Sequence, residues 1–321
     1  MAGRTRIGGL LVLVALVAGC AGAPDRTAQA ARIQSEVEHM PGVKSFSASV
    51  TNDITSGVTL WISADMVDAT EDQIAAVAAR IEQLEGDDFD KYRRTVEFAV
   101  GEGLGVKREG DFDTGRVAAD ARGLRQLKSA LPKNFETASW FRSPTFGQVE
   151  LEDAQHSADI LTGVRDMIGG QSTRVMIMTT AGSREPFSNS RDPLWTVQFP
   201  FTAEDQKAVF DALAALPAPA DAITIEDGHI ARLSVDLATS RNPQSDLESV
   251  INTVGPSTSH PLFLEWKGYT TDPNLRFEGS VDIDACTYPD SGGEDHPEKY
   301  FTPDAIALQK TLRTRFDTCH K

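Results

Sequence analysis

Helical and strand-like patterns alternate along almost the whole chain, and this alternation restricts the fold more than any other feature. In stretches such as Ile74, Val77 and Ile81, apolar residues recur at three- and four-residue steps, which places one helix face in a core. Elsewhere, as in Leu60 and Ile62, apolar residues alternate with polar ones, which is typical of strands with one buried face. Followed along the chain, these patterns predict seven helices separated by pairs of strands.

The order of these predicted elements repeats. Prolines follow Met40, Leu131 and Leu216, and each ends a helix because proline lacks the amide donor that a helix needs. After each proline come two strands, a helix and two more strands. The later helices are predicted to begin near Thr70, Asp120, Ser157, Ala203, Asn242 and Thr302.

A hairpin with a single helix cannot bury its apolar face alone, so the units must pack on one another. We therefore expect an α+β fold of three tandem αββαββ units, with antiparallel or mixed sheets covered by helices on one face and a closing helix over 303–317. An ordinary α+β chain without a repeat is the alternative. The predicted divisions are 1–19 (signal peptide), 20–28 (lipidated linker), 29–119 (unit 1), 120–202 (unit 2) and 203–321 (unit 3).

The first residues have the pattern of an export signal. Arg4 and Arg6 precede an apolar run over 7–18. A helix of that length spans ~18 Å, which is short of the ~30 Å hydrocarbon core of a bilayer. The run is therefore expected to be a signal segment rather than a membrane-spanning helix.

This run ends in Val17-Ala18-Gly19-Cys20, which resembles the lipobox of bacterial lipoproteins. The resemblance implies cleavage between Gly19 and Cys20, a lipid on the Cys20 thiol and a protein held at the outer face of the cell membrane. Arginine outnumbers lysine 21 to 10, as in GC-rich bacterial genomes. A secretory signal with a cysteine there by chance is the alternative.

The first unit also resembles a BON module, a small domain of exported and envelope-associated bacterial proteins. Pro41-Gly42-Val43 follows the first helix, Gly57 lies between the paired strands, and an amphipathic helix comes next. Units 2 and 3 have Lys133-Asn134 and Ala218-Pro219 where this module would have Gly-Val, so the resemblance stays with unit 1.

With Cys20 lipidated, two of the three cysteines are left, Cys286 and Cys319. An oxidising compartment outside the cytosol favours their pairing, and we expect a disulfide between them. Two unpaired thiols are the alternative.

The charge of the chain excludes one class of partner. The net charge is −16, from 47 acidic against 31 basic side chains. A chain without a basic excess does not replace the counterions of a phosphate backbone, so no nucleic-acid partner is expected.

No catalytic, cofactor or metal site is expected. Asp290-Ser291-Gly292-Gly293 resembles the nucleophile segment of trypsin-like serine proteases, but Pro289 precedes it and no histidine has a matching context. These residues also suit a surface turn. The six histidines have no pair at the i,i+4 spacing of a helical metal site.

Trp61 is out of phase with Leu60 and Ile62, so it faces away from their side of the sheet. A binding cleft is one use for such a residue, and packing between units is the use that we favour.

These observations predict a lipid-anchored, non-enzymatic binding module outside the cytosol whose partner is an envelope protein or a glycan. A carrier of a small apolar or lipid ligand is the alternative and would need a sizeable apolar cavity. A hydrolase that uses the segment 286–301 is a third reading.

Overall fold

The structure is a computed structural model that describes residues 24–53, 57–111, 113–179, 193–238, 240–267, 279–286 and 301–319. In these residues the chain forms seven α-helices and one mixed sheet of twelve strands. The predicted mixture of helices and paired strands is confirmed at this level.

The helices and strands follow a regular order, in which a helix and then two strands occur six times before the last helix. The helices are α1 (Thr27–Val37), α2 (Glu71–Glu85), α3 (Thr114–Ala130), α4 (Ser157–Ile168), α5 (Ala203–Ala214), α6 (Pro243–Val254) and α8 (Pro303–Phe316), with a short 3₁₀ turn η1 (Gly86–Phe89) after α2. The strands are β1 (Ser45–Asp53), β2 (Gly57–Asp65), β3 (Arg93–Gly101), β4 (Leu104–Glu109), β5 (Thr137–Arg142), β6 (Gly147–Ala154), β7 (Thr173–Thr179), β8 (Leu194–Phe199), β9 (Ala220–Glu226), β10 (His229–Asp236), β11 (Leu262–Lys267) and β12 (Gly279–Ile283).

The strands lie in the sheet in the order in which they occur in the chain, from β1 to β12. The two strands of each hairpin are antiparallel, as where Ser49 lies opposite Trp61. Successive hairpins join through parallel pairs: β2 with β3, β4 with β5, β6 with β7, β8 with β9, and β10 with β11. The helices α2 to α6 are therefore the crossover connections that parallel neighbours require.

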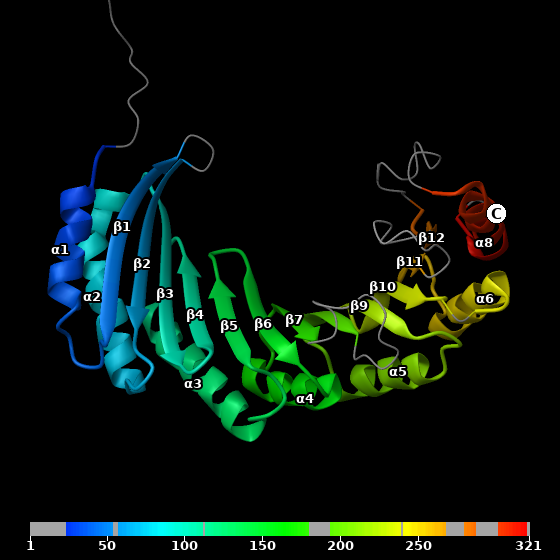
Figure 1. The fold of residues 1–321 in the computed structure, drawn as a ribbon, viewed down its shortest axis with the longest axis horizontal. Coiled ribbons are helices and arrows are strands. Elements are labelled where there is room, and N and C mark those ends of the chain that lie inside the picture. Colours follow the sequence, from blue (N-terminus) through cyan, green and yellow to red (C-terminus); the bar gives the residue numbers. More distant parts are fainter. Residues whose placement is uncertain are drawn as a thin grey trace, which may run out of the picture.

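The sheet bends into an arc, and helices α1 to α6 lie along the outer side of that arc (Figure 1). Along the first part of the arc α1 packs on α2, α2 on α3 and α3 on α4, and at the far end α8 packs on both α6 and β12. The inner side of the arc is the face of the sheet opposite these helices.

Side-chain caps mark the starts of α2, α3, α5, α6 and α8. Thr70 and Gln73 form a reciprocal capping box at the start of α2, as their spacing suggests. Thr202 and Asp205 do the same for α5. α3 begins at Thr114, six residues before the expected start near Asp120, because Asp113 caps it by accepting from the amide of Gly115. Val117 is the one apolar residue of that first turn, so the hydrophobic pattern alone does not show the earlier start.

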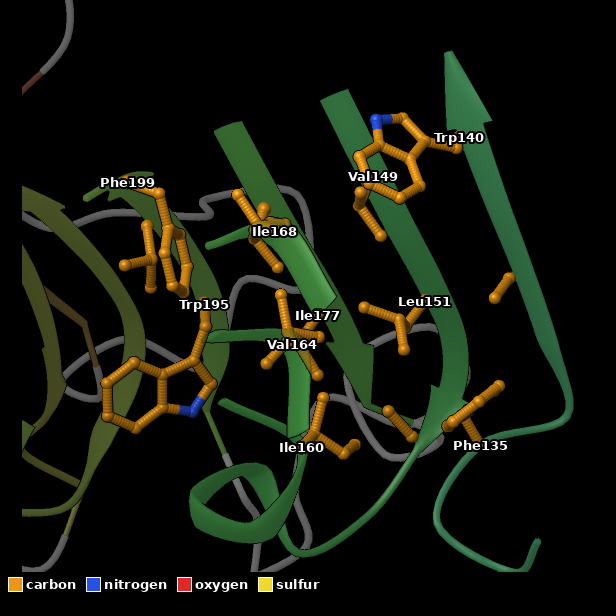
Figure 2. Close-up of a cluster of buried hydrophobic side chains, with 14 of the residues drawn as sticks. Phe135, Trp140, Val149, Leu151, Ile160, Val164, Ile168, Ile177, Trp195 and Phe199 are labelled. Atoms are coloured by element: carbon orange, nitrogen blue, oxygen red, sulfur yellow. The ribbon is translucent and has the colours of Figure 1, made fainter. Parts of the chain in front are cut away.

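The core lies between the sheet and the helices. Figure 2 shows its middle part, where Ile160, Val164 and Ile168 of α4 lie against side chains of β6, β7 and β8 such as Leu151 and Ile177. One continuous buried row crosses five strands, each member opposite the next in the register: Val106, Trp140, Val149, Val175 and Val197. Each such side chain contributes about 1.5–3 kcal/mol by leaving water.

The C-terminal end is closed by a disulfide. The sulfur atoms of Cys286, which follows β12, and Cys319, which follows α8, are 2.11 Å apart, so the predicted pairing is confirmed. Around this bond Gln309 of α8 donates to the Ser280 carbonyl, and the Arg315 guanidinium lies 2.6 Å from the Glu248 carboxylate. The disulfide thus holds α8 over the last strand.

Candidate binding surface

The face of the sheet on the inner side of the arc, here called the open face, carries polar side chains. A row crosses β2 to β8 in register, each residue opposite the next: Ser63, Glu97, Lys107, Phe141, Gln148, Arg174 and Gln198. Those on β4 to β8 are the sequence neighbours of the buried row, and all seven are exposed or half-buried. The period of two along each strand therefore separates an apolar helix side from a polar open face.

Charged residues of both signs lie on the open face, with more carboxylates than cations. The carboxylates include Glu97, Glu109, Glu150, Glu152, Glu226 and Glu265, and the cations include Lys107, Arg174, Arg232 and Lys267. Partial burial raises the pKa of Glu265, and the Arg232 guanidinium opposes that rise. The Lys267 ammonium lies 2.5 Å from the Asp221 carboxylate.

Three aromatic rings on or beside the open face lie next to cations. The Lys107 ammonium is 4.9 Å from the Trp61 ring centroid, and the Arg232 guanidinium is 4.4 Å from that of Phe263. The Arg174 guanidinium is 5.3 Å from the ring of Phe146, in the turn between β5 and β6. Such contacts attract a cation to the electron-rich ring face and hold both groups in place.

Trp61 is 37% exposed, whereas Trp140, Trp195 and Trp266 are all buried in the core. The favoured expectation that Trp61 packs between units is wrong, because its strand neighbours across the open face are the small residues Ser49 and Thr95. The phase of Trp61 predicted its direction correctly. The alternation within one strand shows to which face a side chain points. It does not show whether another part of the protein covers that face.

Two hollows flank the turn between β5 and β6, at one edge of the sheet. One, of about 490 Å³, is lined by Tyr92, Arg93, Arg94, Glu109, Gly110, Phe141, Ser143, Pro144 and Thr145. The other, of about 310 Å³, is lined by Arg108, Asp111, Asp113, Arg116, Arg142, Ser143, Pro144, Thr145, Phe146, Gly147 and Ser172. Charged and hydroxyl-bearing side chains make up most of the lining of the smaller hollow, whereas in the larger one they alternate with Tyr92, Phe141 and Pro144.

No protein-family model, curated protein or solved structure matches this chain.

The C-terminal end brings together one group of potential metal ligands within the described residues: Asp284, Asp317 and Cys319. Cys319 is in the disulfide and has no thiolate to offer. Asp284 accepts from the amide and hydroxyl of Thr318 at 2.5 and 2.7 Å, and Asp317 accepts from the Cys319 amide at 3.0 Å. This group is better explained as a set of caps on the chain end than as a metal site.

Two of the six histidines come together although nothing in their spacing indicates it. The rings of His229, at the start of β10, and His260, before β11, stack with centroids 3.6 Å apart. The pairing of β10 with β11 brings them together, and it joins residues thirty-one positions apart. Of the other four histidines, His296 and His320 lie outside the described residues.

Several predicted sites also lie outside the described residues. These are Gly19 and Cys20 at the expected cleavage and lipidation point, and Asp290-Ser291-Gly292-Gly293 within the segment 286–301. Among the helices that the structure describes, none has the length and apolar character to cross a bilayer.

Glu85, the last residue of α2, gives the stability a pH dependence. Its side chain is 3% exposed, and the Arg94 guanidinium lies 3.6 Å away. Burial raises the pKa of this carboxyl from 4.5 to about 7, against the opposing effect of Arg94. A pKa raised in the folded state means that folding favours the protonated form. Stability is therefore lost as pH rises from about 4.5 through 7.

Glu85→Gln should remove this loss, because the amide stays neutral at every pH. The variant is expected to match the parent near pH 5 and to be about 2–3 kcal/mol more stable at pH 8. Urea unfolding of both proteins at pH 5, 6 and 8 measures the difference. Asp72→Asn, at an exposed position at the other end of the same helix, is the control and should keep the pH profile of the parent. Parallel pH profiles for Glu85→Gln and the parent would contradict the prediction.

Proposed function

We propose that this chain is a lipid-anchored, non-enzymatic binding protein outside the cytosol, and that the open face of its sheet contacts another protein of the cell envelope. In this proposal the lipid on Cys20 supplies the membrane attachment. The scaffold consists of three related αββαββ units, 29–119, 120–202 and 203–321, with their helices on one face. The resemblance of the first unit to the BON module, which occurs in envelope-associated proteins, supports the same location.

The observation that carries the proposal is the exposed Trp61 ring beside Lys107 on the open face. Tryptophan and arginine are enriched among the residues that dominate protein interfaces, and the open face also carries Arg174 and Arg232. The excess of carboxylates on this face and the charge of −16 favour a partner with a basic surface. The disulfide at Cys286 suits an oxidising compartment.

A glycan is the alternative partner, and the crosslinking experiment described below distinguishes it from a protein. We favour the proposed binding function over a carrier of an apolar ligand, because arginines line both hollows: Arg108, Arg116 and Arg142 the smaller one, and Arg93 and Arg94 the larger one. A hydrolase rests on residues outside the described ones.

The attachment is tested with Cys20→Ala in the native host. The parent is expected in the detergent phase, with a mass that includes acyl chains, because two or more chains anchor a protein durably. The variant is expected in the aqueous phase. Equal partitioning of the two proteins would remove the lipid anchor from the proposal.

The binding surface is tested by photo-crosslinking in host membranes. A photoreactive residue at Ser139 or Thr196, both half-buried on the open face, should give one discrete protein adduct that Trp61→Ala weakens. The same probe at Ser35 or Asp211, exposed on α1 and α5, is the control and should not give that adduct. An adduct that glycosidases remove would indicate a glycan. Adducts from the helix positions alone would place the surface elsewhere.

A further inference from the structure

Three charged residues are buried together under one edge of the sheet. Asp120 of α3 lies between Arg108 at the end of β4 and Arg142 at the end of β5. Arg108 Nη2 is 2.5 Å from Asp120 Oδ2, and Arg142 donates from Nε and Nη2 to the two carboxylate oxygens at 2.6 and 3.1 Å. Their side chains are 2%, 6% and 13% exposed for Arg108, Asp120 and Arg142. Two buried guanidinium groups thus share a single carboxylate.

The charge of this trio is unbalanced, with one positive charge in excess. The nearby Asp111 and Asp113 do not balance it, because their side chains are 87% and 65% exposed and each already pairs with another arginine. Their field at the buried pair is screened by water. Burial and the neighbouring charge of Arg142 lower the pKa of Arg108 to about 10, against the opposing effect of Asp120. A buried charge excess of this kind calls for an anion.

The hollow of about 310 Å³ opens on this trio. Arg108 and Arg142 form part of its wall, and Arg116 in the first turn of α3 adds a third guanidinium. The N-terminal end of that helix is itself positive. Ser143, Thr145 and Ser172 add hydroxyl donors. The exposed carboxylates of Asp111 and Asp113 also line the hollow, and Asp113 lies 3.8 Å from Arg116.

Donors remain for a ligand at this wall. Within the described residues Nη1 of Arg142 makes no hydrogen bond, while Nε and Nη2 hold Asp120 and Gln171. Gly147 lies beside that nitrogen, since a Cβ there would be 3.5 Å from Nη1 and 3.7 Å from Thr173 Oγ1. The Thr173 hydroxyl is buried and has no hydrogen-bond partner in the described part of the chain. The absent side chain keeps the approach to Arg142 open.

We propose that this hollow is a binding site for a small oxyanion, a carboxylate or a phosphate group, held by Arg142 and Arg116 above the Arg108–Asp120 pair. The planar guanidinium fork matches two oxygens of either group. The bound anion would neutralise the excess charge of the trio. The site lies beside the open face and does not depend on the function proposed for that face.

Isothermal titration calorimetry of the purified full chain at low salt tests this site with two probes, inorganic phosphate and glucuronate. Saturable binding with a dissociation constant of about 0.1–1 mM is expected for the matching anion. Binding of phosphate alone indicates a phosphate ligand, of glucuronate alone a carboxylate ligand, and of both a site for oxyanions generally. Absence of binding for both probes up to about 10 mM would overturn the proposal.

Substitutions assign the binding to this hollow. Arg142→Gln removes the free donor and leaves Arg108 and Asp120 as a one-to-one pair, so it should fold and bind the anion at least about tenfold more weakly. Arg116→Gln, at an exposed position, should weaken binding in the same direction and serves if the first variant does not fold. Arg32→Gln, at an exposed position on α1, is the control and should bind like the parent. An equal loss in all three variants would mean non-specific attraction and would refute the site.

Discussion

Replacing Asp120 with asparagine is expected to lower the free energy of unfolding by about 3–5 kcal/mol, because it removes one partner of a buried ion group. The amide has nearly the same size, so no cavity forms. The two guanidinium groups of Arg108 and Arg142 would then be buried without the carboxylate that holds them. Urea unfolding followed by tryptophan fluorescence measures the loss, since Trp140 lies in the same region of the core.

Two further variants show whether the cause is the buried charge. Asp211→Asn breaks an exposed pair with Lys207 and should change stability by no more than about 0.5 kcal/mol. Asp120→Asn combined with Arg142→Gln should be more stable than Asp120→Asn alone, because the second change removes one of the stranded charges. If Asp120→Asn unfolds at the same urea concentration as Asp211→Asn, the charge argument fails.

Loss of the disulfide is expected to have an effect of similar size at the C-terminal end of the sheet. Cys286 and Cys319 are 33 positions apart, and a bond that closes a loop of that length stabilises by about 3–4 kcal/mol in the chain-entropy account. With both changed to serine, α8 is held only by contacts such as Gln309 to Ser280 and Arg315 to Glu248. Amide hydrogen exchange should accelerate in α8 and β12 and stay unchanged in β1 to β4.

Reduction provides the control for this variant. Treating the parent with dithiothreitol should reproduce the unfolding midpoint of the double-serine protein, and the same treatment should leave that variant unchanged. Equal exchange rates in α8 for the oxidised parent and the variant would show that the bond does not hold this helix.

The order of elements is readable in the sequence because burial on one face leaves a period in the residues themselves. Leu60 and Ile62 are predicted to be inward-facing from their own strand alone, and both are buried. The parallel pairing between successive hairpins cannot be read from the sequence in this way. Nothing local to Ile62 or Val96 shows that they lie opposite each other, since the choice depends on how whole units pack.

The buried ion group was missed by sequence reasoning, although a signal for it exists. Arg108 and Arg142 continue the inward phase of Val106 and Trp140, and Asp120 lies on α3 in phase with Val117 and Leu124. Charged residues in a buried phase need partners. The partners of Asp120 on α3 lie on β4, before this helix, and on β5, after it. Only the folded structure shows that they meet.

The neighbour-only arrangement of the strands also bears on how the chain reaches its native state. No strand has to find a partner from a remote part of the polypeptide, because each pairs with the one before and the one after it. The entropy lost on closing each connection is therefore small, and ordered growth can start in any hairpin and spread in both directions. Adding or deleting one helix with its two strands would change the length of the arc and preserve the pairing geometry between the remaining neighbouring strands.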